Sequence, residues 1–147
     1  MKVLALIGSD RKNGNTARVI EIFEAQMQAF AKNSKLPFEF ESLYIGSCNI
    51  KPCRGCRVCF DQGEEACPLR DDITLIRTKM DAANVLLVAS PVYVNDVSGL
   101  IKNWMDRLAY LCHRPAMGGK CAYAIATVGG GSFCHAGFSG AAVDLAK

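Results

Sequence analysis

Residues 2 to 16 read KVLALIGSDRKNGNT, an apolar run followed by a loop with two glycines. The run from Val3 to Ile7 is continuously apolar, which predicts a central parallel strand covered on both faces. The segment that begins at Asn15 predicts an amphipathic helix, because apolar residues recur every three or four positions as far as Phe30. A strand, a glycine-containing loop and a helix in this order are typical of a site that holds an anion at the helix start, where backbone N–H groups lack partners.

The loop differs from the two common nucleotide-binding patterns. Five residues separate Gly8 from Gly14, whereas the Walker pattern has four and then Lys-Ser/Thr, and the loop also lacks the dinucleotide spacing G-x-G-x-x-G. The loop provides hydroxyl, amide and basic side chains, namely Ser9, Arg11, Lys12, Asn13, Asn15 and Thr16. Such side chains suit a terminal monophosphate without a metal ion. The alternative is that the Ser, Asn and Thr side chains only cap the helix.

Length and composition predict a single globular domain over residues 1–147. Half of the residues are hydrophobic, 21% are charged, and the formal net charge is only +3. The basic residues are scattered, which gives no indication of nucleic-acid binding. The apolar runs are too short for a signal peptide or a membrane span, so we expect no membrane partner and a cytoplasmic location. In that compartment the eight cysteines are expected to be thiols, metal ligands or redox groups rather than disulfides.

The rest of the chain alternates strands and helices. Strands are expected over residues 3–7, 38–43, 85–90 and 120–128, and helices from residue 15, from residue 71 and over 100–111. This order predicts a doubly wound α/β fold with a parallel sheet. Pro91 is expected to end its strand. Because ligands bind beyond the carboxyl ends of parallel strands, we expect one site from three segments, Gly8–Thr16, Pro91–Ser98 and Thr127–Gly131.

A cysteine-rich loop spans residues 48–67. Cys53, Cys56 and Cys59 have the spacing C-x2-C-x2-C, and Cys67 follows downstream. This pattern indicates a metal site, because three thiols at that spacing surround one centre and a fourth closes the cage. Zinc also accepts four thiolates, although it usually uses two pairs, and a redox-active thiol set without a metal is a further alternative. The other downstream cysteines, Cys112, Cys121 and Cys134, are expected to be small buried hydrophobic residues.

The chain resembles the NAD(P)H-dependent FMN reductase family of flavodoxin-like proteins. The resemblance rests on GSDRKNGNT, on SPVYVNDVSGLIKNWMDR at 90–107, and on the cysteine cluster followed by two aspartates. It extends from Met1 to about Gly131 and is strongest toward the iron-sulfur flavoprotein branch. Flavodoxin-like domains normally have five parallel strands, whereas this sequence shows four.

The resemblance implies an FMN site and an iron-sulfur site. The implied FMN phosphate ligands are Ser9, Arg11, Gly14, Asn15 and Thr16; the implied ring contacts are Pro91, Val92, Tyr93 and Asn95 on one side and Thr127, Gly129 and Gly130 on the other. The implied ligands of a [4Fe-4S] cluster are Cys53, Cys56, Cys59 and Cys67. Arg54 and Arg57 would then partly offset the cluster's negative charge and raise its potential.

The implied function is that of an FMN-dependent oxidoreductase. Such an enzyme takes hydride from NADH or NADPH and passes electrons to a cluster, a quinone, a flavin or another small acceptor. The flavin itself does this chemistry, so no catalytic residue is predicted. A homodimer or homotetramer is also implied. Two alternatives stay open: an FMN and iron-sulfur electron carrier that does not use a nicotinamide, and a non-enzymatic zinc or thiol redox-sensing module.

The segment after Pro91–Ser98, the second of these three loops, has apolar and charged positions with separate expected roles. Trp104 falls on the apolar side of its helix, which predicts a core residue or a subunit contact. Lys102, Asp106 and Arg107 are expected to form a solvated helix face with local ion pairs.

Overall fold

The structure is a computed structural model and describes residues 1–114 and 116–129. Four parallel strands form the sheet in the order β2-β1-β3-β5. These strands are β1 (Lys2–Ile7), β2 (Glu39–Tyr44), β3 (Val85–Tyr93) and β5 (Cys121–Thr127). The order β2-β1-β3 is that of flavodoxin-like sheets, so the predicted fold class is confirmed.

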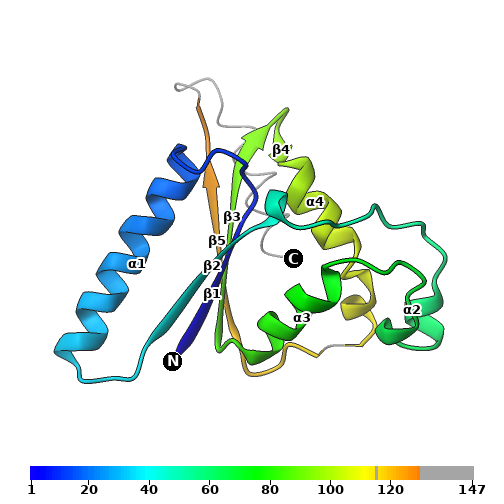
Figure 1. Cartoon of the computed structure of the whole chain (residues 1–147), viewed down its shortest axis with the longest axis horizontal. Helices are drawn as coiled ribbons and strands as arrows, with labels where there is room; N and C mark the ends of the chain where they lie inside the picture. Colours follow the sequence, from blue (N-terminus) through cyan, green and yellow to red (C-terminus); the bar gives the residue numbers. More distant parts are fainter. Residues whose placement is uncertain (115, 130–147) are drawn as a thin grey trace.

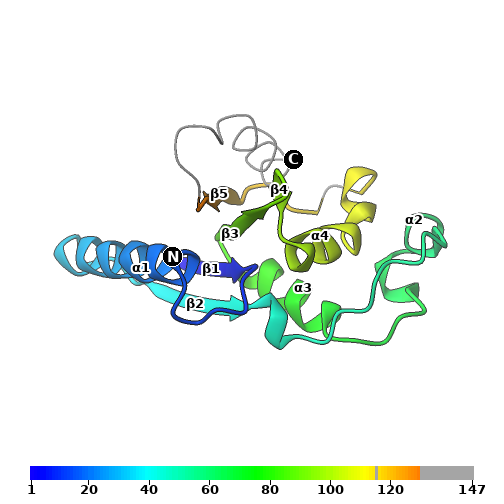
Figure 2. The ribbon, with the colours of Figure 1, turned by 90° about the horizontal axis from the view of Figure 1, so that it is seen from above.

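The helices lie on both faces of the sheet (Figure 1). Helix α1 (Asn15–Asn33) covers one face, and helices α3 (Ile73–Ala82) and α4 (Gly99–Asp106) cover the other. The short helix α2 (Val58–Asp61) lies in the cysteine loop, beyond α3 and α4 and away from α1 (Figure 2). The remaining elements are short 3₁₀ turns at Ile45–Ser47, Glu64–Ala66 and Ala109–Cys112.

The core has two halves because successive strand residues point to opposite faces. From β1, Leu4 and Leu6 pack toward Ile76 and Ile101 of the α3–α4 layer. Their neighbours Val3, Ala5 and Ile7 pack with Ile20 of α1. Every residue from Val3 to Ile7 is at most 1% exposed, and each large apolar side chain buried in this way contributes about 1.5–3 kcal/mol. The continuous apolar run of β1 therefore reflects burial on both faces, as predicted.

The strand with Pro91 differs from its prediction. Parallel pairing of β3 with β1 ends at Ala89 and pairing with β5 ends at Pro91, but the strand continues to Tyr93. There it pairs antiparallel with the two-residue strand β4 (Asp96–Val97). Proline lacks an N–H donor and is tolerated at the end of a ladder, so Pro91 ends the parallel pairing but not the strand. Strand β4 belongs to this hairpin, and the described residues contain no fifth parallel strand.

Helix α4 is shorter than the helix predicted over 100–111. It ends at Asp106, and a separate 3₁₀ turn follows at Ala109–Cys112. Of the helices described, none combines the length and apolarity needed to cross a bilayer.

Candidate functional site

The first loop leaves β1 at Gly8 and runs directly beside β3 and α4. The Gly8 N–H donates to the carbonyl oxygen of Ala89 at 2.8 Å. A Cβ atom at Gly8 would lie 2.1 Å from Cγ1 of Ile101, which is fully buried. Only glycine fits this close approach between the loop and α4.

The start of α1 presents backbone N–H groups to the loop. Its N-cap is Gly14, which has no side chain, and the Gly14 carbonyl accepts from the N–H of Arg18 at 3.0 Å. In the described residues, no loop side chain accepts a hydrogen bond from the first-turn amides of Asn15, Thr16 or Ala17. Capping alone therefore does not account for the polar side chains of this loop, and the amides together with the helix dipole suit an anion.

Thr16 joins the first loop to the end of β5. The hydroxyl oxygens of Thr16 and Thr127 lie 2.6 Å apart and share a hydrogen bond across 111 positions of sequence. Thr16 is buried and Thr127 is half-buried. The structure thus brings two of the three predicted segments together at the start of α1.

We expect a double-mutant cycle of Thr16→Val and Thr127→Val to give a coupling free energy of about 0.5–1.5 kcal/mol. Each single substitution leaves one hydroxyl without its partner, whereas the double substitution removes both. Urea unfolding of the four proteins measures this coupling. Additive effects of the two substitutions would contradict it.

A cleft between the first and second loops contains the next group of predicted residues. It is lined by Gly8, Ser9, Asp10, Arg11, Tyr93, Ser98, Gly99 and Leu100. A second hollow, lined by residues 10–15, adjoins it along the same loop. Ser9 is buried and its hydroxyl accepts from the Arg11 N–H at 3.3 Å, whereas the Arg11 side chain is exposed. The predicted residues Ser9, Arg11 and Tyr93 therefore meet at one cleft beside the start of α1.

A tight hairpin holds Tyr93 at the edge of the cleft. Val94 and Asn95 have left-handed φ angles of 50° and 65°, as in a two-residue type I′ turn. Val94 is β-branched and 99% exposed, so its backbone is strained without compensating burial. Hydrogen bonds below the turn stabilise it: the Ser98 N–H donates to Ser90 Oγ at 2.8 Å, and the Ile101 N–H donates to Ser98 Oγ at 3.3 Å.

The remaining residues predicted to contact the flavin do not line this cleft. Pro91 stands opposite Thr127 in the β3–β5 register, and Val92 stands opposite Val97. Asn95 and Gly129 are exposed. Gly130 lies outside the described residues.

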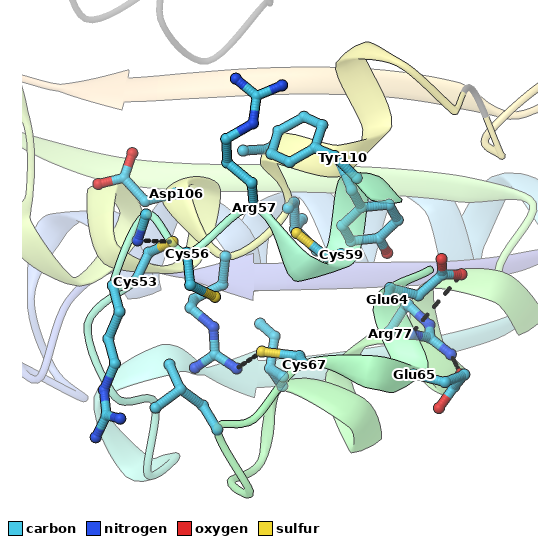
Figure 3. Close-up of a pocket in the computed structure, with 18 of the residues that line it drawn as sticks. Cys53, Cys56, Arg57, Cys59, Glu64, Glu65, Cys67, Arg77, Asp106 and Tyr110 are labelled. Atoms are coloured by element: carbon cyan, nitrogen blue, oxygen red, sulfur yellow. Dashed lines mark hydrogen bonds and ion pairs between the residues drawn. The ribbon is translucent and has the colours of Figure 1, made fainter. Parts of the chain in front are cut away.

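Cys53, Cys56, Cys59 and Cys67 line a separate pocket, between the cysteine loop, α3 and the residues that follow α4 (Figure 3). The loop turns at Gly55 and Arg57, which have left-handed φ angles of 65° and 63°. The Gly55 N–H donates to Cys53 Sγ at 3.5 Å. Over residues 1–114 and 116–129, no three His, Cys, Asp or Glu side chains are close enough together to hold a metal ion. The pocket therefore gathers the four predicted ligands without bringing their sulfurs to ligation distance.

Burial perturbs the thiols of two cysteines in this loop, Cys48 and Cys59. Cys48 lies outside the pocket, packs against the core, and donates from Sγ to the Tyr44 carbonyl at 3.6 Å. Burial raises the pKa of the Cys48 thiol, with Asp72 adding to the rise. Burial also raises the pKa of the Cys59 thiol, and the other three pocket cysteines add to that rise. The pocket cysteines are thus near enough to interact electrostatically.

Arg107 is the main residue whose role was not predicted. It was expected on a solvated face, but it is 7% exposed and its guanidinium pairs with the Asp71 carboxylate, whose side chain is fully buried. The prediction was wrong because Arg107, the residue that caps the end of α4, follows Trp104 by three positions and so lies on the same, apolar side of the chain. That spacing was the available signal. The neighbouring pair Lys102–Asp106 is an exposed ion pair, as predicted.

Asp71 and Asp72, which follow the cysteine loop, hold the start of that loop through hydrogen bonds to its backbone. Asp71 accepts from the N–H groups of Lys51 at 2.9 Å and Ile73 at 3.3 Å, and Asp72 accepts from the Asn49 N–H at 2.7 Å. Burial alone would raise the pKa of Asp71. The hydrogen bonds from Arg107, Lys51 and Ile73 outweigh burial and hold that pKa below its usual value.

Cys112, Cys121 and Trp104 lie outside both the cleft and the cysteine pocket. Cys112 and Cys121 are exposed, so their prediction as buried residues was wrong; Cys121 lies on β5, at the edge of the described sheet. Cys134 lies outside the described residues. Trp104 is 6% exposed in the core, as predicted.

Ser90 and Ser98 also had no predicted role. Ser98 caps α4 and Ser90 holds the Ser98 backbone, so both position the second loop. A serine directly before an apolar helical segment was the signal for Ser98. The single Ser90 at the end of an apolar strand offered no comparable signal.

Similar proteins were found by sequence and by structure. An iron-sulfur flavoprotein of Archaeoglobus fulgidus is 33% identical over 120 residues, 82% of this chain and 51% of that protein. One of Methanocaldococcus jannaschii is 36% identical over 107 residues, 73% of this chain and 51% of that protein. The chain thus spans about half the length of these relatives.

Solved structures show the same fold at lower identity. An apo NADH:FMN oxidoreductase has a TM-score of 0.62 at 20% identity, covering 97% of this chain and 63% of that one. An NAD(P)H:quinone oxidoreductase from Methanothermobacter marburgensis has a TM-score of 0.63 at 17% identity, covering 95% and 72%.

The family itself follows from the sequence. Residues 1–136 match the sequence profile described as NADPH-dependent FMN reductase. This match includes the first loop, the second loop and the whole cysteine pocket. The chain therefore belongs to the NADPH-dependent FMN reductase family.

Proposed function

We propose that the chain binds FMN at the first-loop cleft, with the phosphate at the start of α1. The free first-turn amides and the buried hydroxyl of Ser9 support this position for the phosphate, and exposed Arg11 adds positive charge beside it. Tyr93 and Leu100 line the part of the cleft that suits the flavin ring. The family profile supports FMN as the ligand.

We further propose that Cys53, Cys56, Cys59 and Cys67 hold a [4Fe-4S] cluster. The donor set fits, because four thiols line one pocket and Cys48 is engaged elsewhere. Since the sulfurs are not at ligation distance, binding must draw the cysteine loop together.

The proposed reaction is electron transfer from NADH or NADPH to a small acceptor. Bound FMN supplies hydride acceptance and the cluster supplies one-electron transfer. The protein positions the two groups. Helix α4 starts at the flavin cleft with Ser98 and ends at the cysteine pocket with Arg107, and this link is the observation that best supports the proposal. The identity of the acceptor, a cytoplasmic location and assembly into homodimers or homotetramers stay predictions.

The test is purification without oxygen, followed by an absorbance spectrum and by counting of FMN, iron and acid-labile sulfide per chain. We expect flavin bands over a broad iron-sulfur absorbance, with about four irons per chain, and bleaching of the flavin by NADH or NADPH. Flavin without iron would refute the cluster. If FMN and iron are both present but neither NADH nor NADPH bleaches the flavin, the chain is an electron carrier that does not use a nicotinamide. Absence of both FMN and iron would refute the proposed function.

Substitution of single cysteines tests the ligand assignment. We expect Cys56→Ser to lose most of its iron while it keeps FMN, because a three-thiolate site holds the cluster weakly. Cys48→Ser is the matched control, since Cys48 lies in the same loop but outside the pocket, and it should keep its iron. Equal iron in both variants would contradict the assignment.

A further inference from the structure

Arg107 is a buried cation directly at the cysteine pocket. It follows the last residue of α4 and lines the pocket together with the four cysteines. Its Nη1 donates to the Lys51 carbonyl at 2.9 Å and pairs with Asp71, and its Nη2 donates to Cys67 Sγ at 3.6 Å. One side chain thus joins both ends of the cysteine loop to α4.

The two terminal nitrogens of the Arg107 guanidinium have different partners, and one of them faces a sulfur atom. Nη1 makes the contacts to Lys51 and Asp71, whereas Nη2 faces Cys67. The Asp71 carboxylate also accepts two backbone N–H groups, so its charge is shared among several donors. A neutral thiol is a weak acceptor, and a metal-bound sulfur is a much better one. The Nη2 position is therefore suited to a ligating sulfur.

The other arginines of the loop are less suited to this role. Arg54 and Arg57 are exposed, and Arg57 lies 5.7 Å from the centroid of the Phe60 ring. Charges in water are strongly screened. Arg107 is 7% exposed, so its effect on a group in the pocket is screened far less.

We propose that Arg107 is a positioning residue for Cys67, which holds this sulfur as a ligand and raises the reduction potential of the cluster bound there. A hydrogen bond to a ligating sulfur stabilises the more negative, reduced form of a cluster. A buried positive charge acts in the same direction. The inference rests on the proposed cluster and adds a residue, Arg107, that lies 40 positions after Cys67.

The test compares Arg107→Lys with the wild-type chain. Lysine keeps the positive charge opposite Asp71 but lacks the planar fork that also reaches sulfur. We expect the variant to keep FMN and to show a lower midpoint potential of the cluster, measured by a redox titration followed by electron paramagnetic resonance. Lys102→Met is the matched control: it removes a cation from the same helix, but Lys102 pairs with Asp106 on the surface. Its midpoint should equal that of the wild type.

Each outcome decides the inference. Loss of iron from Arg107→Lys with FMN content and thermal unfolding unchanged supports a role at Cys67, as does a lowered midpoint. A wild-type midpoint with full iron overturns it, and so does loss of iron together with FMN and cooperative unfolding, which would make Arg107 a residue of the fold alone. A wild-type protein without iron is seen before any variant is measured. That result refutes the proposed cluster and the inference with it, whereas the other negative results leave the proposed function intact.

Discussion

Asp71→Ala is expected to lower the free energy of unfolding by about 3–5 kcal/mol, the usual effect of removing one partner of a buried ion pair. The substitution leaves the guanidinium of Arg107 buried without its carboxylate, and the N–H groups of Lys51 and Ile73 without their acceptor. This is a large part of the stability of a small domain, which is about 5–15 kcal/mol. Urea unfolding followed by circular dichroism measures the change.

The neighbouring Asp72 provides the control. Asp72→Ala removes one hydrogen bond to the Asn49 N–H and no buried ion pair, so we expect a loss of only about 1 kcal/mol. Equal losses of unfolding free energy in the two variants would show that the Arg107–Asp71 pair contributes no more to stability than a single hydrogen bond.

Asp71→Ala should also alter the stability of the protein in acid. Because the folded-state pKa of Asp71 is lowered, its contribution is complete above the pKa of an unfolded aspartate, about 3.9. The contribution is lost as the pH falls through the lower folded-state pKa. The stability difference between the wild type and Asp71→Ala should therefore be constant near neutral pH and shrink below about pH 4. A difference that grows in acid would contradict this assignment.

Gly8→Ala is the second large expected effect. The new Cβ would lie 2.1 Å from Ile101 Cγ1 and 2.9 Å from Ser98 Oγ, both on buried residues. Overpacking of this kind costs about 1–3 kcal/mol, and the required shift moves the first loop relative to α4. We expect lower stability in urea and weaker FMN binding in a fluorescence titration.

Gly99→Ala is the matched control for this substitution. Gly99 lines the same cleft, but a Cβ there meets no atom within 4 Å. Alanine also favours a helix over glycine by about 1 kcal/mol, so this variant should be at least as stable as the wild type. A Gly8→Ala protein with unchanged stability would show that the loop and α4 separate freely.

The sequence was most informative where burial repeats with a regular period. The run of β1 and the spacing of apolar residues in α1 predicted both elements and hence the doubly wound sheet. Pro91 misled the prediction because its local effect was considered without the hairpin that continues the strand. The early end of α4 could not be predicted, since the apolar spacing continues through Leu108 and Leu111 into a different kind of turn.

In the candidate site, too, residues with a local sequence pattern were predicted and residues without one were not. Spacing alone grouped the four pocket cysteines, and the order of strands brought the first loop to Tyr93 and Thr127. The partner of a buried charge depends on residues distant in sequence, such as Asp71 for Arg107. A pairing of that kind has no local pattern, so it becomes visible only in the folded chain.

Helix α4 also imposes a restriction on length. Its eight residues rise about 12 Å at the usual rise per residue, and both of its ends are engaged, at Gly8 through Ile101 and at Cys67 through Arg107. One inserted residue would rotate everything after it by about 100°, which would point Arg107 away from the pocket. Exposed positions such as Lys102 are open to substitution, but insertions and deletions between Ile101 and Arg107 are not tolerated by this geometry.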